Sequence, residues 1–195
     1  MTFRKSLLVA GAAFVIAGMS PVIAADQPDI NALKAEAKEI VQGFFKELKG
    51  TLVSTMKEKG PAGAVDVCHE KAQEITKKHN KNGWKVGRTA LKIRNPKNAP
   101  DAWEKAVLQE FEKKIAEGAD PKTLVKAEIV EQDGKKVFRF MKAIPVKKPC
   151  LNCHGEKVNP DLYKTIKKYY PEDQAIGFKL GQLRGAFTLS KPLEQ

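Results

Sequence analysis

The residues best suited to chemistry form one short run, Cys150-Leu151-Asn152-Cys153-His154. Two cysteines separated by two residues and followed directly by histidine form the C-x-x-C-H pattern that attaches a c-type haem. The spacing suits this chemistry because the two thiols can bond the two vinyl groups along one porphyrin edge, while the histidine reaches the iron. The pattern predicts one covalently bound haem c, with Cys150 and Cys153 as attachment points and His154 as proximal iron ligand.

Three other uses of these residues are open at this point. A Cys150–Cys153 disulfide of the thioredoxin type normally lies at a helix N-terminus after a strand, whereas this pair lies in a segment rich in Pro and Lys. A zinc site needs further ligands from elsewhere in the chain, where the candidates are Cys68, His69 and His79. The third alternative is a reactive dithiol without a cofactor.

The other face of a haem iron needs a second ligand or an open position. Cys68 is the one cysteine outside the motif, and helical phase places it on an apolar line with Val65 and Ala72. His69 lies about 100° around the same helix among polar residues, and Met141 lies in a predicted strand near the motif. Cys68 is therefore the first candidate for the distal ligand, with Met141 and His69 as alternatives. Without that role, Cys68 is a small buried hydrophobe.

The first residues carry the pattern of an export signal. A basic start precedes an apolar run over residues 7–19, which is too short to span a bilayer comfortably. Residues 22 and 24 then fit the −3 and −1 positions of a signal-peptidase site. We therefore predict a signal peptide over residues 1–24, cleaved from a single domain of residues 25–195 that is exported to the periplasm. A retained N-terminal anchor is the alternative.

Composition and charge narrow the class of protein further. Apolar residues make up 42% of the chain and charged residues 30%, which is typical of a soluble globular domain and not of a disordered or polytopic membrane protein. Loss of Arg4 and Lys5 with the signal lowers the net charge from +12 to +10. A basic periplasmic protein meets little nucleic acid, so the charge concerns docking of an acidic redox partner protein or the surface potential. Most of it is Lys spread over helical faces, for which a solvated surface is the alternative. No second segment is apolar and long enough to suggest a membrane span after signal cleavage.

Helical and strand patterns alternate around the motif. A helical apolar stripe covers residues 28–59 and ends at Gly60-Pro61, and a second helix is predicted over residues 62–79. The strand pattern over residues 84–94 slips in its apolar parity, which predicts a bulge near Gly87. The other predicted elements are a helix from about residue 101 to Gly118, strands 124–131 and 136–144 joined by a turn at Asp133-Gly134, a loop over 145–160, a helix over 161–170 and a strand over 183–189. This order favours an α+β fold with an antiparallel sheet flanked by helices.

Four segments together resemble a known family. They are AVDVC at 64–68, GRTALKIRNPKNAPDAWE at 87–104, KPCLNCHG at 148–155 and GFKLGQLRGAF at 177–187. They resemble the PAS-like c-type haem domain family, whose members occur as free exported proteins and as sensor regions of signalling kinases. The resemblance implies a PAS-like sheet, a long N-terminal helix, and His and Cys as axial ligands, here His154 and Cys68. Arg88, Arg94 and Arg184 fall in these segments and are candidate partners for the haem propionates.

The resemblance implies a redox or diatomic-gas sensor. A thiolate ligand donates charge to ferric iron and lowers its reduction potential. We hypothesise that Cys68 stays bound to Fe(III) and leaves on reduction, which opens one face to CO or NO. The alternative is a soluble periplasmic electron-transfer cytochrome. We expect no enzyme activity, because the sequence supplies no clear distal acid–base pair. The long first helix is also a candidate homodimer interface, although packing of its single apolar stripe on its own domain satisfies the pattern equally well.

Overall fold

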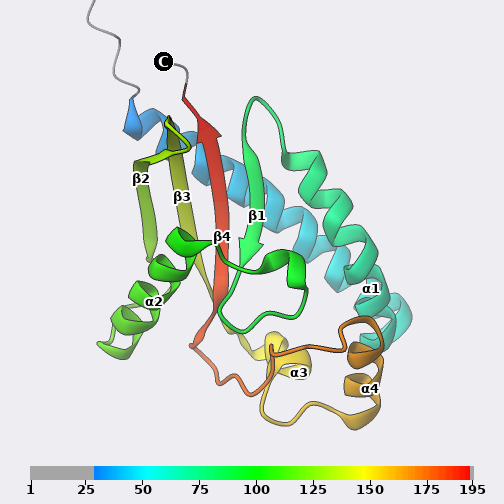
Figure 1. Cartoon of the computed structure of the whole chain (residues 1–195). Helices are drawn as coiled ribbons and strands as arrows, with labels where there is room; N and C mark the ends of the chain where they lie inside the picture. Colours follow the sequence, from blue (N-terminus) through cyan, green and yellow to red (C-terminus); the bar gives the residue numbers. More distant parts are fainter. Residues whose placement is uncertain (1–28, 194–195) are drawn as a thin grey trace, which may run out of the picture.

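The centre of the molecule is a four-stranded antiparallel sheet in the order β1-β4-β3-β2, seen in a computed structural model that describes residues 29–193 (Figure 1). The predicted signal peptide, residues 1–24, lies outside the described residues. The strands are β1 (Lys85–Thr89), β2 (Val125–Gln132), β3 (Lys135–Pro145) and β4 (Leu183–Pro192). The helices are α1 (Ile30–His79), α2 (Ala102–Ala116), α3 (Leu151–His154) and α4 (Pro160–Tyr169), with 3-10 turns η1 (Pro96–Asn98) and η2 (Lys148–Cys150). This is the predicted α+β architecture.

Helix α1 consists of two arms. The Asp29 carboxylate caps the first arm by accepting the N–H groups of the first turn, and the helix is interrupted at Gly60, whose φ is +68°. Glu47 of the first arm contacts both Lys78, at 2.8 Å, and His79, at 3.0 Å, near the end of the second. The arms therefore lie side by side in opposite directions (Figure 1), and the break between them at Gly60 is the one that the sequence predicted.

Each face of the sheet carries its own apolar core. The α1 face buries Ala37, Val41, Phe44, Ile75, Trp84, Val86, Phe138, Phe140, Phe187 and Leu189. The α2 face buries Val107, Leu108, Phe111, Leu124, Met141, Ala143, Leu183 and Ala186. A capping box, in which Asp101 and Glu104 exchange side-chain and backbone hydrogen bonds, fixes the start of α2. Alternate residues of β3 and β4 thus point to opposite helical layers.

The second arm of α1 runs directly into edge strand β1. The Asn80 side-chain oxygen accepts the N–H of Val86 at 2.8 Å, and the N–H of Trp84 donates to the Lys81 carbonyl at 2.9 Å. Trp84 is 2% exposed, and its ring meets that of Phe138 edge-on at 5.8 Å. A short, hydrogen-bonded joint therefore connects this helical arm to the sheet.

Two local predictions need correction. The bulge near Gly87 is absent from β1, since the register from Lys85 opposite Ser190 to Thr89 opposite Ala186 is continuous. The chain leaves the sheet after Thr89, so the slip in apolar parity marks the end of the strand. The predicted loop over residues 145–160 contains η2 and the single turn α3. The turn at Asp133-Gly134 is confirmed, with positive φ at both residues.

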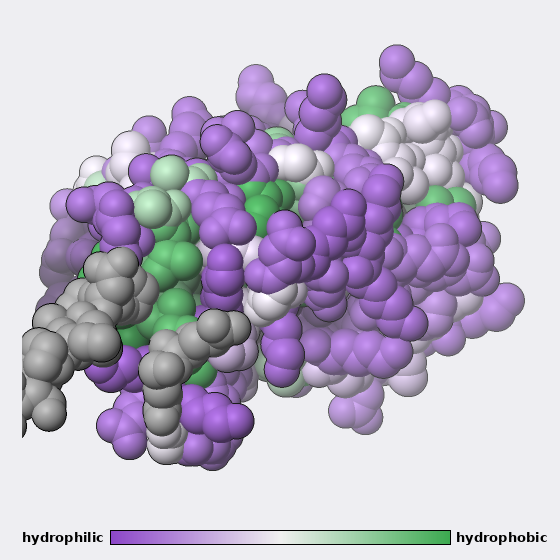
Figure 2. Space-filling view, turned by 90° about the horizontal axis from the view of Figure 1, so that it is seen from above, coloured by the Kyte–Doolittle hydropathy of each residue, from purple (hydrophilic) through white to green (hydrophobic). Residues whose placement is uncertain are grey.

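Much of the surface is hydrophilic, and Figure 2 also shows hydrophobic residues gathered in a band near one end of the molecule. The exposed large hydrophobic residues among those described are Ile30, Phe45, Leu52, Val53 and Leu180. Four of these five belong to the first arm of α1. Within residues 29–193, no helix combines the length and the apolar character required for a membrane span.

Candidate functional site

The C-x-x-C-H residues form a tight turn below one end of the sheet (Figure 1). Cys150 ends η2, and α3 carries Cys153 and His154, so the two cysteines lie three residues apart on a helical turn. Both thiols are free and partly buried. The backbone N–H of Lys147 lies 3.4 Å from the Cys150 sulfur, and burial raises the pKa of the Cys153 thiol. The turn therefore presents two reduced thiols and one imidazole together.

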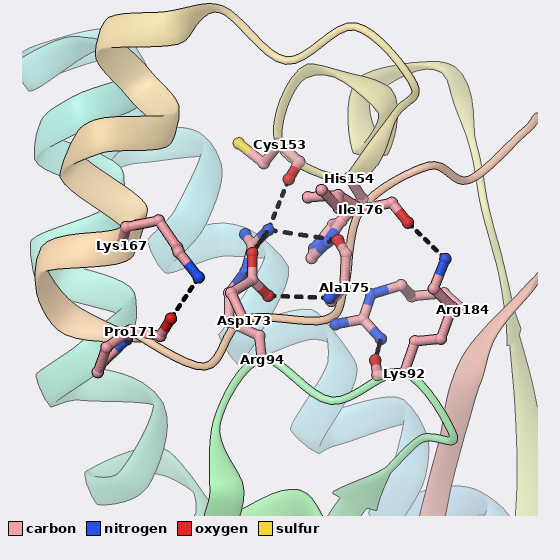
Figure 3. A network of polar contacts seen from close by, with 10 residues as sticks. All are labelled: Lys92, Arg94, Cys153, His154, Lys167, Pro171, Asp173, Ala175, Ile176 and Arg184. Atoms are coloured by element: carbon pink, nitrogen blue, oxygen red, sulfur yellow. Dashed lines mark hydrogen bonds and ion pairs between the residues drawn. The ribbon is translucent and has the colours of Figure 1, made fainter.

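The His154 imidazole is fixed by a backbone carbonyl. Its Nδ1 lies 2.7 Å from the Ala175 oxygen, and because a carbonyl can only accept, Nδ1 carries the proton (Figure 3). This leaves Nε2 with the lone pair that a metal ion requires. Burial holds the pKa of His154 well below its usual value, and the charges of Arg184 and Arg94 lower this pKa further. The neutral imidazole is the form that binds metals.

The segment after α4 runs alongside the motif. The N–H of Phe178 donates to the His154 carbonyl at 2.9 Å, and the N–H of Gly177 donates to the Gly155 carbonyl at 3.0 Å. The Phe178 ring also meets the imidazole edge-on, at 6.3 Å between ring centroids. A side chain at Gly155 would place its Cβ 2.6 Å from the Leu151 carbonyl oxygen. Glycine at this position thus permits the close turn after His154.

An ion pair that sequence reasoning missed supports this segment. Arg94 makes a bidentate contact with the Asp173 carboxylate, in which Nε lies 3.1 Å and Nη2 3.0 Å from the two oxygens (Figure 3). Its Nη2 also donates to the Cys153 carbonyl at 2.6 Å. The Asp173 side chain is fully buried and also accepts the Ala175 N–H at 2.9 Å. Arg94, a predicted propionate partner, is therefore engaged with protein groups. Nothing local in the sequence marks Asp173, which lies 79 residues from Arg94.

The other two predicted arginines also lie near His154. Arg184 donates to the Lys92 carbonyl at 3.2 Å, and its guanidinium lies over the Phe178 ring at 5.4 Å. Burial, together with the charges of Arg94 and Arg88, lowers the pKa of Arg184 to about 10. The charge of Arg88 in β1 also contributes to the lowered pKa of His154. All three predicted arginines thus lie where their charges lower the pKa of the His154 imidazole.

The candidates for the distal position fall into three environments. Cys68 lies in the second arm of α1, but its side chain is outside the described part of the structure. Val65, three residues earlier, belongs to the apolar cluster against which Cys153 packs. His69 is exposed and lies against two neighbouring tyrosine rings, at 5.2 and 5.3 Å, at the end of α4. Met141 is fully buried in the α2 core, where its role is packing.

A separate hollow of about 610 Å³ lies over β1, β3 and β4 near the start of α2. Its lining includes Arg139, which pairs with Asp101 at 2.7 Å and Glu104 at 3.3 Å, and contains none of the motif residues. Among the side chains that the structure describes, no three His, Cys, Asp or Glu residues gather as a metal-ion ligand set. The polar cluster at Arg139 is therefore distinct from the C-x-x-C-H turn.

Comparison with known proteins identifies the family of the chain and supports its fold. Residues 24–192 match the family described as Tll0287-like. No curated protein matches the chain. Among solved structures, the chain is similar to the crystal structure of the cyanobacterial haem protein Tll0287, with 24% identity, a TM-score of 0.59, and coverage of 84% of this chain and 97% of that chain. The likeness confirms the α+β, PAS-like fold implied by the sequence segments.

Proposed function

This chain belongs to the Tll0287-like family, and on that premise we propose that it is a haem-binding protein. In this proposal one haem c is attached covalently through Cys150 and Cys153, with His154 as the proximal and Cys68 as the distal iron ligand. Support comes from a similar solved structure described as that of a haem protein, and from the two free thiols beside a metal-competent imidazole. With haem bound, His154 would supply an imidazole and Cys68 a thiolate, and both are ligands that haem iron takes in proteins.

The observation that carries the proposal is the 2.7 Å hydrogen bond from His154 Nδ1 to the Ala175 carbonyl. Histidines that bind metals nearly always donate their other ring N–H to a carbonyl or carboxylate, which fixes the tautomer and the ring orientation. Here that bond is present beside the two cysteines of an attachment motif. A histidine whose only role is packing would not need to follow an attachment motif, to be buried and to hold its proton on Nδ1.

The arginines supply the second part of the fit. A haem brings two propionates, and Arg suits a bidentate contact with a carboxylate. The pKa of Arg184 is lowered to about 10 by burial and by its like-charged neighbours, which is the environment that an added anion relieves. In the proposal, Arg88 and Arg184 face the propionates, and Arg94 contributes its charge from the Asp173 pair.

We propose that the chain is a redox or diatomic-gas sensor. A bound c-type haem supplies a one-electron iron couple. With haem bound, the Cys68 thiolate would hold the iron and favour its oxidised state. When an external donor supplied one electron, Cys68 would be the ligand to be protonated and released, and its position would then be available to CO or NO. Val65 contacts the cluster beside Cys153, so a change at residue 68 lies next to a packed interface of the helical arm. Displacement of that arm is the proposed readout.

Electron transfer is the second candidate function. Lys147, Lys148 and Lys157 are exposed around the motif turn, and such cations favour docking of an acidic redox partner protein.

The proposal also includes export to the periplasm, no nucleic-acid or membrane contact, and no enzyme activity. The apolar residues Phe45, Leu52 and Val53 on the first arm of α1 are the surface proposed for a homodimer.

The test is maturation in a host that attaches c-type haem, followed by mass spectrometry and spectroscopy. We expect a peptide containing residues 150–154 to carry the mass of one haem. Cys68→Ala should change the ferric EPR g-values, while the matched variant Met141→Leu should leave them unchanged, because Met141 packs in the core. A tryptic map without added mass rejects covalent haem, and unchanged g-values in Cys68→Ala remove Cys68 from the iron.

A CO titration separates the two functions. A sensor of the proposed kind binds CO only after reduction. The Cys68→Ala variant should bind CO without first releasing a cysteine ligand, since residue 68 no longer carries a thiol. An electron carrier keeps a six-coordinate low-spin spectrum on reduction, refuses CO, and exchanges electrons at a rate that falls steeply with salt. The second pattern would replace the sensor proposal with the electron-transfer function.

A further inference from the structure

A buried ion pair lies directly behind the proposed proximal ligand. We propose that Arg94 and Asp173 form a positioning pair that sets the orientation and hydrogen bonding of the His154 imidazole, and thereby the reduction potential of the site. The inference rests on the proposed haem function and goes beyond it, because neither residue is an iron ligand. Figure 3 shows the pair between the Cys153 carbonyl, Ala175 and His154.

Asp173 is the anchor of the arrangement. Its side chain has no exposed surface, and a buried carboxylate is stable only when it is paired and hydrogen-bonded. Three donors meet this need: Arg94 Nε at 3.1 Å, Arg94 Nη2 at 3.0 Å and the Ala175 N–H at 2.9 Å. The charge of Asp173 is therefore fixed close to the peptide group that faces His154.

Arg94 connects three segments that are far apart in the sequence. It follows β1, it holds Asp173 after α4, and its Nη2 donates to the Cys153 carbonyl at 2.6 Å inside the motif turn. The same nitrogen lies 3.4 Å from the Ala175 carbonyl. Nearby, the Gln174 N–H donates to the Ile93 carbonyl at 2.9 Å, which ties the segment after α4 to the segment after β1. The planar guanidinium of Arg94 can donate to a carboxylate and to a carbonyl at the same time, and a lysine ammonium group cannot reproduce this geometry.

Ala175 transmits the arrangement to the imidazole. Its N–H is held by Asp173, and its carbonyl oxygen accepts the hydrogen bond from His154 Nδ1. A strong bond at Nδ1 makes the imidazole a better electron donor and so favours the oxidised metal. Weakening either contact of Ala175 lets the imidazole turn and lowers its basicity. The pair thus acts on the imidazole through the backbone N–H and carbonyl of Ala175, and Arg94 also contacts the Cys153 carbonyl of the motif.

The experiment compares Asp173→Asn and Arg94→Lys with wild type, each as matured holoprotein. Both variants should shift the reduction equilibrium toward Fe(II), by about tenfold for Asp173→Asn, which corresponds to about 59 mV for a one-electron couple. Both should also change the ferric EPR g-values. Arg94→Lys keeps the positive charge, so a shift in that variant reports the geometry of the fork rather than electrostatics alone.

The control is Glu104→Gln, which weakens a buried ion pair with Arg139 away from the motif. It should lower the melting temperature and leave the potential and the g-values unchanged. If Asp173→Asn and Arg94→Lys behave like this control, the positioning role is wrong and the pair is structural. Failure of both to acquire haem, while Glu104→Gln matures, also overturns it. Wild-type protein without haem rejects the proposed function itself.

Discussion

Positive charge is concentrated around His154. Arg88, Arg94 and Arg184 all act on the pKa of this imidazole, while Asp173 is the buried acid that pairs with Arg94. Like charges gathered in a partly buried region destabilise the chain unless an anion joins them. The three arginines should therefore lower the stability of the haem-free chain and add stability once the haem propionates are present.

Arg184→Gln tests that difference. In the haem-free chain, relief of repulsion offsets the lost bond to the Lys92 carbonyl and the contact with Phe178, so the free energy of unfolding should change by less than about 1 kcal/mol. In the haem-bound protein the same change should cost about 1.5–3 kcal/mol, because a propionate loses a charged hydrogen bond. Urea unfolding of both forms measures this. Lys179→Gln is the control, and equal losses in both forms contradict the assignment.

Two glycines should respond in opposite directions to alanine. Gly155→Ala places a Cβ 2.6 Å from the Leu151 carbonyl oxygen, so the backbone must shift and stability should fall by about 1–3 kcal/mol. Gly50 lies within α1 with no atom near its missing Cβ, so Gly50→Ala should add about 0.5–1 kcal/mol. Thermal unfolding gives both signs. A stable Gly155→Ala protein would show that the turn after His154 is loose.

Among single residues, the C-x-x-C-H motif could be predicted from the sequence, whereas the ion pair that supports it could not. Spacing alone identified Cys150, Cys153 and His154 as a group, because adjacent residues must lie together in any fold. Asp173 carries no such sign, since its partner Arg94 is 79 residues away and acidic residues in loops are usually exposed. Contacts made only through tertiary structure leave no local pattern.

Among the elements, the two-armed α1 positions both residue 68 and the entry to the sheet. The pairing of Glu47 with Lys78 and His79 joins its arms, and Phe44 packs against the His79 ring at 5.4 Å. Gly60-Pro61 made the break predictable, because a glycine with positive φ before proline ends a helix. The extent of β1 was not predictable, since apolar residues continue after Thr89 although the hydrogen-bond ladder stops there.

Acid should weaken the joint between the arms. Hydrogen bonds from Lys78 and then His79 lower the pKa of Glu47 below its usual value, so between the two values the unfolded chain binds more protons than the folded one. The stabilisation is thus present above about pH 4.5 and is lost as pH falls through the lowered pKa. Glu47→Gln should flatten this part of the urea-midpoint profile. An identical pH profile in the variant would remove Glu47 from the joint.

Over the whole molecule, apolar packing is uneven. The sheet is covered by two large clusters, whereas the motif and α4 rest on the smaller clusters around Val65 and Phe178. The covalent haem is proposed to bind at this less packed end. Much of the stability of the motif end should therefore depend on the cofactor.

Hydrogen exchange should show this division. In the haem-free chain, amides of β3 and β4 should be protected longest, because both strands are central and contact both cores. Amides of α3 and α4 should exchange first, and haem attachment should slow them selectively. Mass spectrometry of exchanged peptides measures the order. Uniform protection before and after attachment contradicts the dependence of this end on haem.

The joint between the second arm of α1 and β1 contains a tryptophan whose fluorescence can be used to follow this part of the protein. Trp84 sits in that joint, 2% exposed and edge-on to Phe138, one short turn beyond the helix that carries residue 68. We expect its fluorescence to respond to the proposed movement of the arm, and a bound iron porphyrin to quench the emission according to its distance from the ring. Trp103, stacked at 4.4 Å on Arg139 across the sheet, supplies a second fluorophore as an internal reference. Time-resolved emission can therefore follow the arm without an added label.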